Sequence, residues 1–219
     1  MALAAALLIG APAARVAATN EATLAVVPEA AIEGGEGLRI TVDGRLGAGQ
    51  RAFLVDETPA GESTYRAVFW FDANGLTLAA GDSLLLFEGL VGNTSSVGLP
   101  RIPGFRLYLR KPPRGMALRL AAELIAEDRT RTFTPGVGVP LRGRRRIQVE
   151  WQAASAPGAQ DGLLRLSLLG ARAHTATAPA VANAAHRLVT VRLGADEVDA
   201  GTFGSFFLDG FEPYRALAP

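Results

Sequence analysis

The chain has 219 residues, of which 49% are hydrophobic and 20% charged, and its formal net charge is +1. The apolar content excludes an intrinsically disordered chain, and the near-neutral charge excludes a strong electrostatic attraction to nucleic acid. Because cysteine is absent, a disulfide framework, a thiolate metal site and a cysteine nucleophile are excluded as well. Lys111 is the only lysine, and this arginine bias, with abundant alanine and glycine, is typical of a GC-rich bacterial genome.

The N-terminal segment, residues 1–18, is predicted to be a signal peptide. An apolar run over residues 2–9 is followed by small residues at 11–13 and 16–18, the pattern of a signal-peptidase site. No basic residue precedes the run, since Arg15 follows it, so an N-terminal helix packed on the domain is the alternative. The run is too short to span a bilayer, and no other segment has the length and apolarity to do so. We therefore expect a secreted protein, periplasmic or extracellular.

Residues 19–37 form a lead-in segment, for which we expect at most one short strand. Beyond this segment, the side chains alternate between apolar and polar with a period of two. That period is the mark of half-buried β-strands. Apolar alternation or short apolar runs predict strands, in chain order, at residues 38–42, 65–71, 84–87, 105–110, 116–124, 147–152 and 164–168. The turn Asp72-Ala73-Asn74-Gly75 ends the second of these strands, and residues 111–115, with two prolines and a glycine, join two others into a hairpin. At the end of the chain, two further strand-like runs, 191–195 and 201–212, flank a loop rich in glycine and acidic residues.

The predicted strands have no helices between them, which excludes parallel pairing through crossover helices. The sequence therefore predicts an all-β fold, a two-sheet antiparallel β-sandwich, formed by a single domain over residues 38–219.

Three pieces of the chain resemble one known family. They are residues 58–71, residues 147–152 with 161–166, and residues 191–194 with 201–202 and 208–215. In this order they resemble bacterial members of the laminin-G-like, concanavalin A-like lectin and glucanase jelly-roll superfamily. The resemblance implies a jelly roll. It leaves the function open, because the superfamily includes lectin-like domains, adhesion modules, glycosidases and polysaccharide lyases.

The resemblance also implies candidate site residues. Glycosidases of this fold use paired carboxylates, but Glu197 and Asp199 lie in the acidic loop 194–201, where a solvated turn is the better interpretation. Lyases of this fold use a tyrosine or histidine beside arginine and an amide. The local motifs expected of such lyases are absent, although one outer sheet face could hold the side chains of Arg106, Tyr108, Arg119, Gln148 and Gln152. The preferred interpretation is a polar face that only keeps the sheet soluble.

A structural calcium ion is a further implication of the resemblance. Jelly rolls of this kind often hold Ca²⁺ near the last strand with an Asp carboxylate and backbone carbonyls, and Asp209 occupies the matching position. The preferred interpretation is that Asp209 caps a turn or points to solvent. No other cofactor is expected to be required.

The remaining polar and aromatic candidates have simpler interpretations. Trp151 alternates with Ile147 and Val149 and is expected in the core, whereas Trp70 is a candidate platform for a sugar ring if it is exposed. The arginine run at Arg142, Arg144, Arg145 and Arg146 either binds an anionic polysaccharide or leads into the strand at 147, and we prefer the second interpretation. His174 and His186 are expected at the surface.

No catalytic motif is present, so the sequence favours a secreted, non-catalytic recognition or adhesion module that binds carbohydrate. A polysaccharide lyase or glycoside hydrolase of the same fold is the first alternative, and a structural surface protein is the second.

Overall fold

The computed structural model describes residues 15–19, 22–32, 34–47, 49–57, 59–92, 102–171 and 173–215. In this part of the chain, eight strands form one antiparallel sheet, here called sheet A, in the order β1-β4-β14-β6-β7-β8-β10, with β9 paired to β8. The strands of sheet A are β1 Arg15–Thr19, β4 Arg51–Asp56, β6 Ser83–Val91, β7 Ile102–Arg110, β8 Leu118–Ile125, β9 Arg131–Phe133, β10 Val137–Val139 and β14 Leu188–Asp196.

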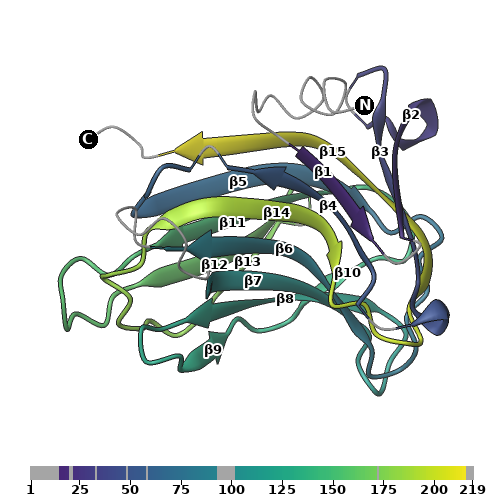
Figure 1. Cartoon of the computed structure of the whole chain (residues 1–219). Helices are drawn as coiled ribbons and strands as arrows, with labels where there is room; N and C mark the ends of the chain where they lie inside the picture. Colours follow the sequence, from purple (N-terminus) through teal and green to yellow (C-terminus); the bar gives the residue numbers. More distant parts are fainter. Residues whose placement is uncertain are drawn as a thin grey trace.

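Seven described strands form the second antiparallel sheet, sheet B, in the order β13-β12-β11-β5-β15-β3-β2. Its strands are β2 Thr23–Val27, β3 Gly37–Asp43, β5 Thr64–Asp72, β11 Arg145–Gln152, β12 Leu163–Leu169, β13 His174–Thr177 and β15 Phe203–Arg215. Two short 3-10 helices, Pro28–Ala30 and Gly44–Leu46, flank β3. The long strands of sheet A lie side by side in the middle of Figure 1, and β5 and β15 of sheet B run along its upper side.

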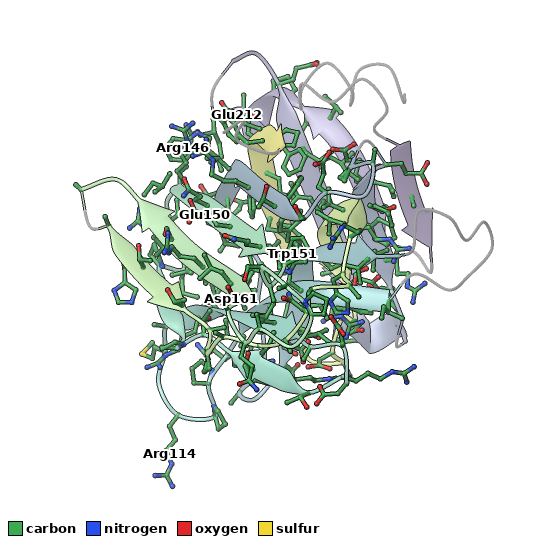
Figure 2. All side chains as sticks on the ribbon, turned by 90° about the vertical axis from the view of Figure 1, so that its left-hand side faces the viewer. Arg114, Arg146, Glu150, Trp151, Asp161 and Glu212 are labelled. Atoms are coloured by element: carbon green, nitrogen blue, oxygen red, sulfur yellow. The ribbon has the colours of Figure 1, made fainter. Side chains whose placement is uncertain are left out.

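The two sheets enclose a core in which aromatic rings from both layers meet. Phe87 of sheet A contacts Phe69, Phe105 and Phe211, with ring centroids 5.7, 5.5 and 6.1 Å away. The predicted core residue Trp151 is 1% exposed, packs against Phe105 and lies inside the molecule in Figure 2. The alternation along β5 and β11 therefore placed the apolar face of both strands correctly.

The predicted fold class is confirmed: the chain is an all-β, two-sheet antiparallel sandwich. The hairpin predicted around residues 111–115 joins β7 to β8, which pair antiparallel. The strand before Asp72-Ala73-Asn74-Gly75 ends at Asp72, and Asn74 takes a φ of 46° in the turn. Within the described residues, no helix has the length and apolarity needed to cross a membrane.

Two edge strands lie within the N-terminal segments for which the sequence made predictions. β2 is the single short strand expected within residues 19–37, and it pairs with β3 at the edge of sheet B. β1 overlaps the end of the predicted signal peptide and pairs with β4 over five residues, whereas residues 1–14 lie outside the described residues. Cleavage after residue 18 would remove most of β1, whereas cleavage after residue 13 would keep it. Removal of the peptide stays a prediction.

Candidate functional site

A row of charged side chains crosses the outer face of sheet A. Residues directly opposite each other in an antiparallel ladder lie on the same face, with their Cβ atoms about 5 Å apart. In order across β14, β6, β7 and β8, the opposed residues are Arg192, Glu88, Arg106 and Glu123. Their charges alternate in sign, so each side chain has opposite charges as its lateral neighbours.

Glu88 is the centre of this row. Its side chain is only 4% exposed, and its two oxygens face two arginines: Oε1 lies 2.9 Å from Nη1 of Arg192, and Oε2 lies 3.6 Å from Nε of Arg106. Burial raises the pKa of the Glu88 carboxyl, because the loss of hydration outweighs the attraction of Arg192 and then Arg106. Glu88 therefore holds two guanidinium groups beside each other, and the loss of hydration of its own carboxylate costs free energy.

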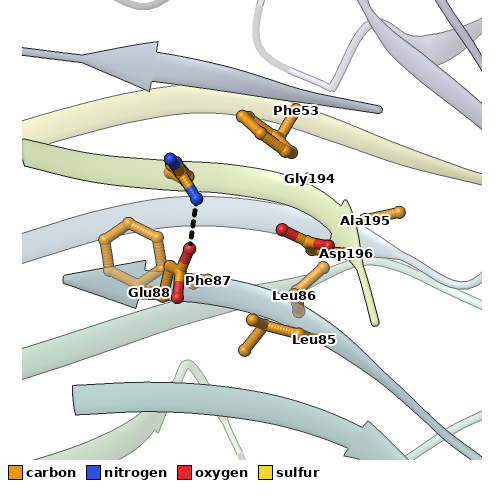
Figure 3. A pocket seen from close by; sticks show the side chains of 9 residues that line it. Phe53, Leu85, Leu86, Phe87, Glu88, Gly194, Ala195 and Asp196 are labelled. Atoms are coloured by element: carbon orange, nitrogen blue, oxygen red, sulfur yellow. Dashed lines mark hydrogen bonds and ion pairs between the residues drawn. The ribbon is translucent and has the colours of Figure 1, made fainter. Parts of the chain in front are cut away.

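Three residues of the row, Arg192, Glu88 and Arg106, line a groove of about 360 Å³. The side chains that line it come from β4, β14, β6, β7 and the residue after β14, and they are Arg51, Glu88, Leu90, Pro103, Arg106, Arg192, Asp196 and Glu197. A shallower depression continues beside Glu88 between Phe53, Leu85 and Asp196, and the dashed line in Figure 3 marks the contact of Glu88 with Arg192. Arg192 also stacks over the Phe53 ring, 5.0 Å from its centroid.

Tyr108 lies on the same face, two residues beyond Arg106 on β7. Nη1 of Arg106 donates to the phenol oxygen at 3.2 Å, and the phenol donates to Oε2 of Glu197 at 3.3 Å. Burial, with Glu197 and Glu123 nearby, raises the pKa of Tyr108 despite the opposing effect of Arg106. Tyr108 therefore holds its proton at neutral pH and donates a hydrogen bond to Glu197, which lines the groove.

A β-bulge at the end of β14 brings Glu197 into this position. The pairing of β14 with β6 is irregular between Leu193 and Asp196, and Gly194 has a φ of 153°. A Cβ atom at Gly194 would lie 2.3 Å from the carbonyl oxygen of Ala52, so the bulge requires glycine. Asp196 then accepts hydrogen bonds from the Arg51 side chain and from the backbone N–H of Glu197.

The outer face of sheet A continues past the groove with further arginines. Arg110 lies over the rings of Tyr108 and Phe133, at 4.8 and 5.4 Å from their centroids. Arg119 is directly opposite Arg110, and Arg131 of β9 lies 3.3 Å from the buried Glu123. On this face, the described arginines Arg51, Arg106, Arg110, Arg119, Arg131 and Arg192 outnumber the carboxylates Glu88, Glu123, Asp196 and Glu197.

The structure separates the ligand-binding candidates that the sequence placed on one sheet face. Arg106, Tyr108 and Arg119 lie on the outer face of sheet A. Gln148 and Gln152 are opposite Val68 and Thr64 in sheet B, and therefore lie on the other side of the sandwich. The prediction of a shared face is wrong, because alternation along a strand does not reveal to which sheet the strand belongs. Binding by any of these residues stays a prediction.

Trp70 lies on the outer face of sheet B, opposite Arg146 and Asp209, and is partly buried. The arginine run behaves as the preferred interpretation expected: Arg142 and Arg144 are exposed before β11, and Arg145 and Arg146 begin that strand. Figure 2 shows Arg146, Glu150 and Glu212 together on this side of the molecule.

The two histidines lie away from the groove. His174 is exposed at the start of the edge strand β13, as expected. His186 is only 6% exposed, so its predicted surface position is wrong. Hydrogen bonds to Glu127 and to the N–H of Ala154 hold its loop, in which Asn183 is fully buried, against the protein. Burial lowers the pKa of His186, with Glu127 acting in the opposite direction.

The predicted calcium ligand Asp209 is occupied by backbone donors. Its Oδ2 accepts the N–H of Ile32 at 2.6 Å, and its Oδ1 accepts the N–H of Gly210 at 2.7 Å. Within the described residues, no three or more acidic, histidine or cysteine side chains gather into a cluster that could hold a metal ion. A site made of the Asp209 carboxylate and backbone carbonyls is not tested by this finding, and calcium binding stays a prediction.

Of the residues that line the groove, sequence reasoning identified only Arg106 as a binding candidate, and it missed Arg51, Glu88 and Arg192. Glu88 follows four apolar residues and is the lone acid of its strand, a signal that was available. Arg192 stands between Val191 and Leu193, the usual pattern of an outward-facing charge. For Glu197, the interpretation as a solvated turn is incomplete, because its carboxylate turns back onto Arg106. The Asp199 carboxylate joins its loop to the start of β6, where it accepts the N–H of Ser83.

No protein-family model and no curated protein sequence matches the chain. Several solved structures share its fold. An endo-β-1,4-glucuronan lyase from the fungus Trichoderma reesei has a TM-score of 0.68 and 14% identity, over 93% of this chain and 91% of that chain. The alginate lyase vAL-1 from a Chlorella virus has a TM-score of 0.61 and 9% identity, over 90% of each chain. The cellulose induced protein Cip1 has a TM-score of 0.59 and 11% identity, over 92% of each chain.

The chain therefore shares the two-sheet jelly-roll fold of these solved structures. Its candidate site is a charged groove on the outer face of sheet A. At these identities the likeness establishes the fold, and the function has to be argued from the groove.

Proposed function

We propose that the outer face of sheet A binds an acidic polysaccharide. The observation that carries the proposal is the groove in which Arg51, Arg106 and Arg192 converge beside the Tyr108 hydroxyl. Guanidinium groups suit carboxylates, because they donate paired hydrogen bonds in a fixed plane. The structural neighbours named as lyases of glucuronan and alginate support a carbohydrate ligand with carboxylate groups.

The spacing of the arginines supports a chain that runs across the strands. Arg192 on β14 and Arg106 on β7 are separated by β6 alone, so their backbones are two strand spacings, ~10 Å, apart, while both guanidinium groups turn toward Glu88 between them. One pyranose unit of a 1,4-linked polysaccharide has a length close to one strand spacing. Alternate sugars in an extended chain direct their carboxylates to the same side. Arginines on every second strand therefore match carboxylates on every second sugar.

The proposal is tested by calorimetric titration with uronate oligosaccharides and with neutral cello-oligosaccharides. Uronate oligosaccharides are expected to bind, with an affinity that falls as salt increases. Arg192→Gln is expected to weaken binding about ten-fold or more, since a hydrogen bond to a charged group contributes about 1.5–3 kcal/mol.

The matched control is Arg165→Gln, which removes an arginine paired with Glu150 at 2.9 Å on the outer face of sheet B. This variant is expected to bind as the unchanged protein does. Equal affinity for the neutral oligosaccharides, or full binding by Arg192→Gln, would contradict the proposal.

A second candidate function is eliminative cleavage of the same polysaccharide, and the Tyr108 hydroxyl is the observation that favours it. Elimination next to a carboxylate needs a base to remove a proton from carbon and an acid to protonate the leaving oxygen. The raised pKa of Tyr108 suits the acid rather than the base. In the described part of the chain, neither histidine lines the groove to supply a base. We therefore rank binding first.

The two functions are distinguished by incubation of the protein with polyuronate and measurement of the ultraviolet absorbance of an unsaturated uronate end. A signal that disappears in Tyr108→Phe would establish cleavage. Tight binding without any such signal would support a recognition module.

A further inference from the structure

We infer that Glu197 is a built-in competitor for the ligand: its carboxylate occupies the place on Arg106 and Tyr108 that a carboxylate of the acidic polysaccharide takes. This inference rests on the proposed function and identifies the residue that sets the preference for anionic ligands.

The contacts of Glu197 are those expected of a bound uronate carboxylate. Oε1 lies 3.0 Å from Nη2 of Arg106, and Oε2 accepts the phenol hydrogen of Tyr108 at 3.3 Å. One carboxylate thus bridges a guanidinium and a hydroxyl at the wall of the groove. Any ligand carboxylate that reaches Arg106 meets these same two donors.

Of the two carboxylates on Arg106, only that of Glu197 can be displaced cheaply. The Glu197 side chain is 46% exposed, so on leaving Arg106 it turns into water. Glu88 is 4% exposed, and a charge separated from its partners there would remain buried. Glu88 therefore stays as the floor of the groove while Glu197 leaves.

The backbone beneath Glu197 is held in place, so that the exchange involves the side chain alone. Glu197 has a φ of 47°, a conformation that is uncommon for a non-glycine residue. Its N–H donates to Asp196 at 2.8 Å, and the same Asp196 oxygen accepts from Arg51 at 2.9 Å. The competitor is thereby kept at the edge of the groove whether its carboxylate is bound or displaced.

The displacement of the Glu197 carboxylate from Arg106 distinguishes acidic from neutral sugars. An acidic sugar replaces one carboxylate on Arg106 by another, so the charge balance of the site is kept. A neutral sugar that displaces Glu197 leaves the half-buried guanidinium of Arg106 with weaker hydrogen bonds, which costs free energy. Selectivity for anionic chains follows from this difference.

The test compares Glu197→Gln with the unchanged protein in titrations with uronate oligosaccharides. Glutamine keeps the size of the side chain and removes its charge. Because an exposed ion pair contributes modestly, Glu197→Gln is expected to bind about two- to five-fold tighter. The gain should persist at higher salt, where long-range attraction is screened but a local exchange is not.

The matched control is Glu212→Gln on the outer face of sheet B. Glu212 has the same kind of partners as Glu197, an arginine at 3.4 Å (Arg146) and a tyrosine hydroxyl at 2.6 Å (Tyr214). Its substitution changes the net charge equally and is expected to leave the affinity unchanged.

Each result decides between the two claims. If the unchanged protein binds and Glu197→Gln binds equally or more weakly, the inference that Glu197 competes with the ligand is refuted and the proposed function stands. An equal gain in affinity in Glu212→Gln, or a gain in affinity of Glu197→Gln that is lost at higher salt, refutes the same inference. If neither the unchanged protein nor Glu197→Gln binds any uronate oligosaccharide, the proposed function itself is refuted.

Discussion

Phe87 contacts aromatic rings from both sheets, and Gly89, two residues further along β6, makes room for one of them. A Cβ atom at Gly89 would lie 2.1 Å from Cε1 of Phe105. The glycine is required by the close approach of the ring, since its φ is not positive. The centre of the sandwich thus depends on a residue without a side chain.

Gly89→Ala is expected to lower the free energy of unfolding by about 1–3 kcal/mol, because the Phe105 ring has to leave its packed position. Chemical denaturation measures the change. Gly138→Ala in β10 is the control, since a Cβ atom there meets nothing within 4 Å, and it is expected to change the free energy by no more than about 0.5 kcal/mol. Equal losses in both variants would show that the space around Gly89 is not limiting.

His186 makes the stability of the fold depend on pH. Burial lowers the pKa of His186 in the folded state, so the unfolded chain takes up a proton first as the pH falls. The proton uptake favours unfolding from about pH 7 downwards, near the ordinary histidine pKa of about 6.5, until the folded histidine is itself protonated.

The expected result is that His186→Leu, which cannot titrate, loses less stability than the unchanged protein between about pH 7.5 and about pH 5.5. Urea denaturation at the two pH values measures this difference. Parallel losses in both proteins would mean that His186 is equally easy to protonate in the folded and unfolded states.

At the scale of the strands, the alternation of side chains predicted the long central strands, whereas β4 and the short strands β1, β9, β10 and β13 were not predicted. The strands around Phe69, Leu107, Val149 and Leu166 were all found from their period of two, because each has one face in the core. The same alternation distinguishes the inner from the outer face of a strand. It carries no information about which other strands lie beside it.

The candidate site was therefore predicted only in part. Arg106 and Tyr108 were identified, but Gln148 was placed beside them, although β7 pairs with β6 and β8 whereas β11 pairs with β5 and β12. The partners that define the site, Glu88 and Arg192, come from strands far apart in the sequence that meet only through the register of sheet A. Such non-local pairing is a property of the whole topology, and no local pattern in this chain reveals it.

The two outer faces of the whole molecule differ in their charge arrangement. On sheet B, the ion pairs Arg146–Glu212 and Arg165–Glu150 are separate and partly exposed, and pairs of this kind contribute little to stability. On sheet A, the charges form a continuous row around the buried Glu88 and line a groove. A fold that needed only solubility would not require a desolvated carboxylate between two arginines. The row of sheet A is therefore the part of the molecule that we connect with function.

The most direct test of the central claim is to follow the backbone amide signals of the protein by nuclear magnetic resonance during titration with a uronate oligosaccharide. The account predicts that the changes concentrate on β14, β6 and β7, around Arg192, Glu88 and Arg106, and spare the outer face of sheet B. Changes that concentrate on the outer face of sheet B, or no changes at saturating oligosaccharide, would contradict it.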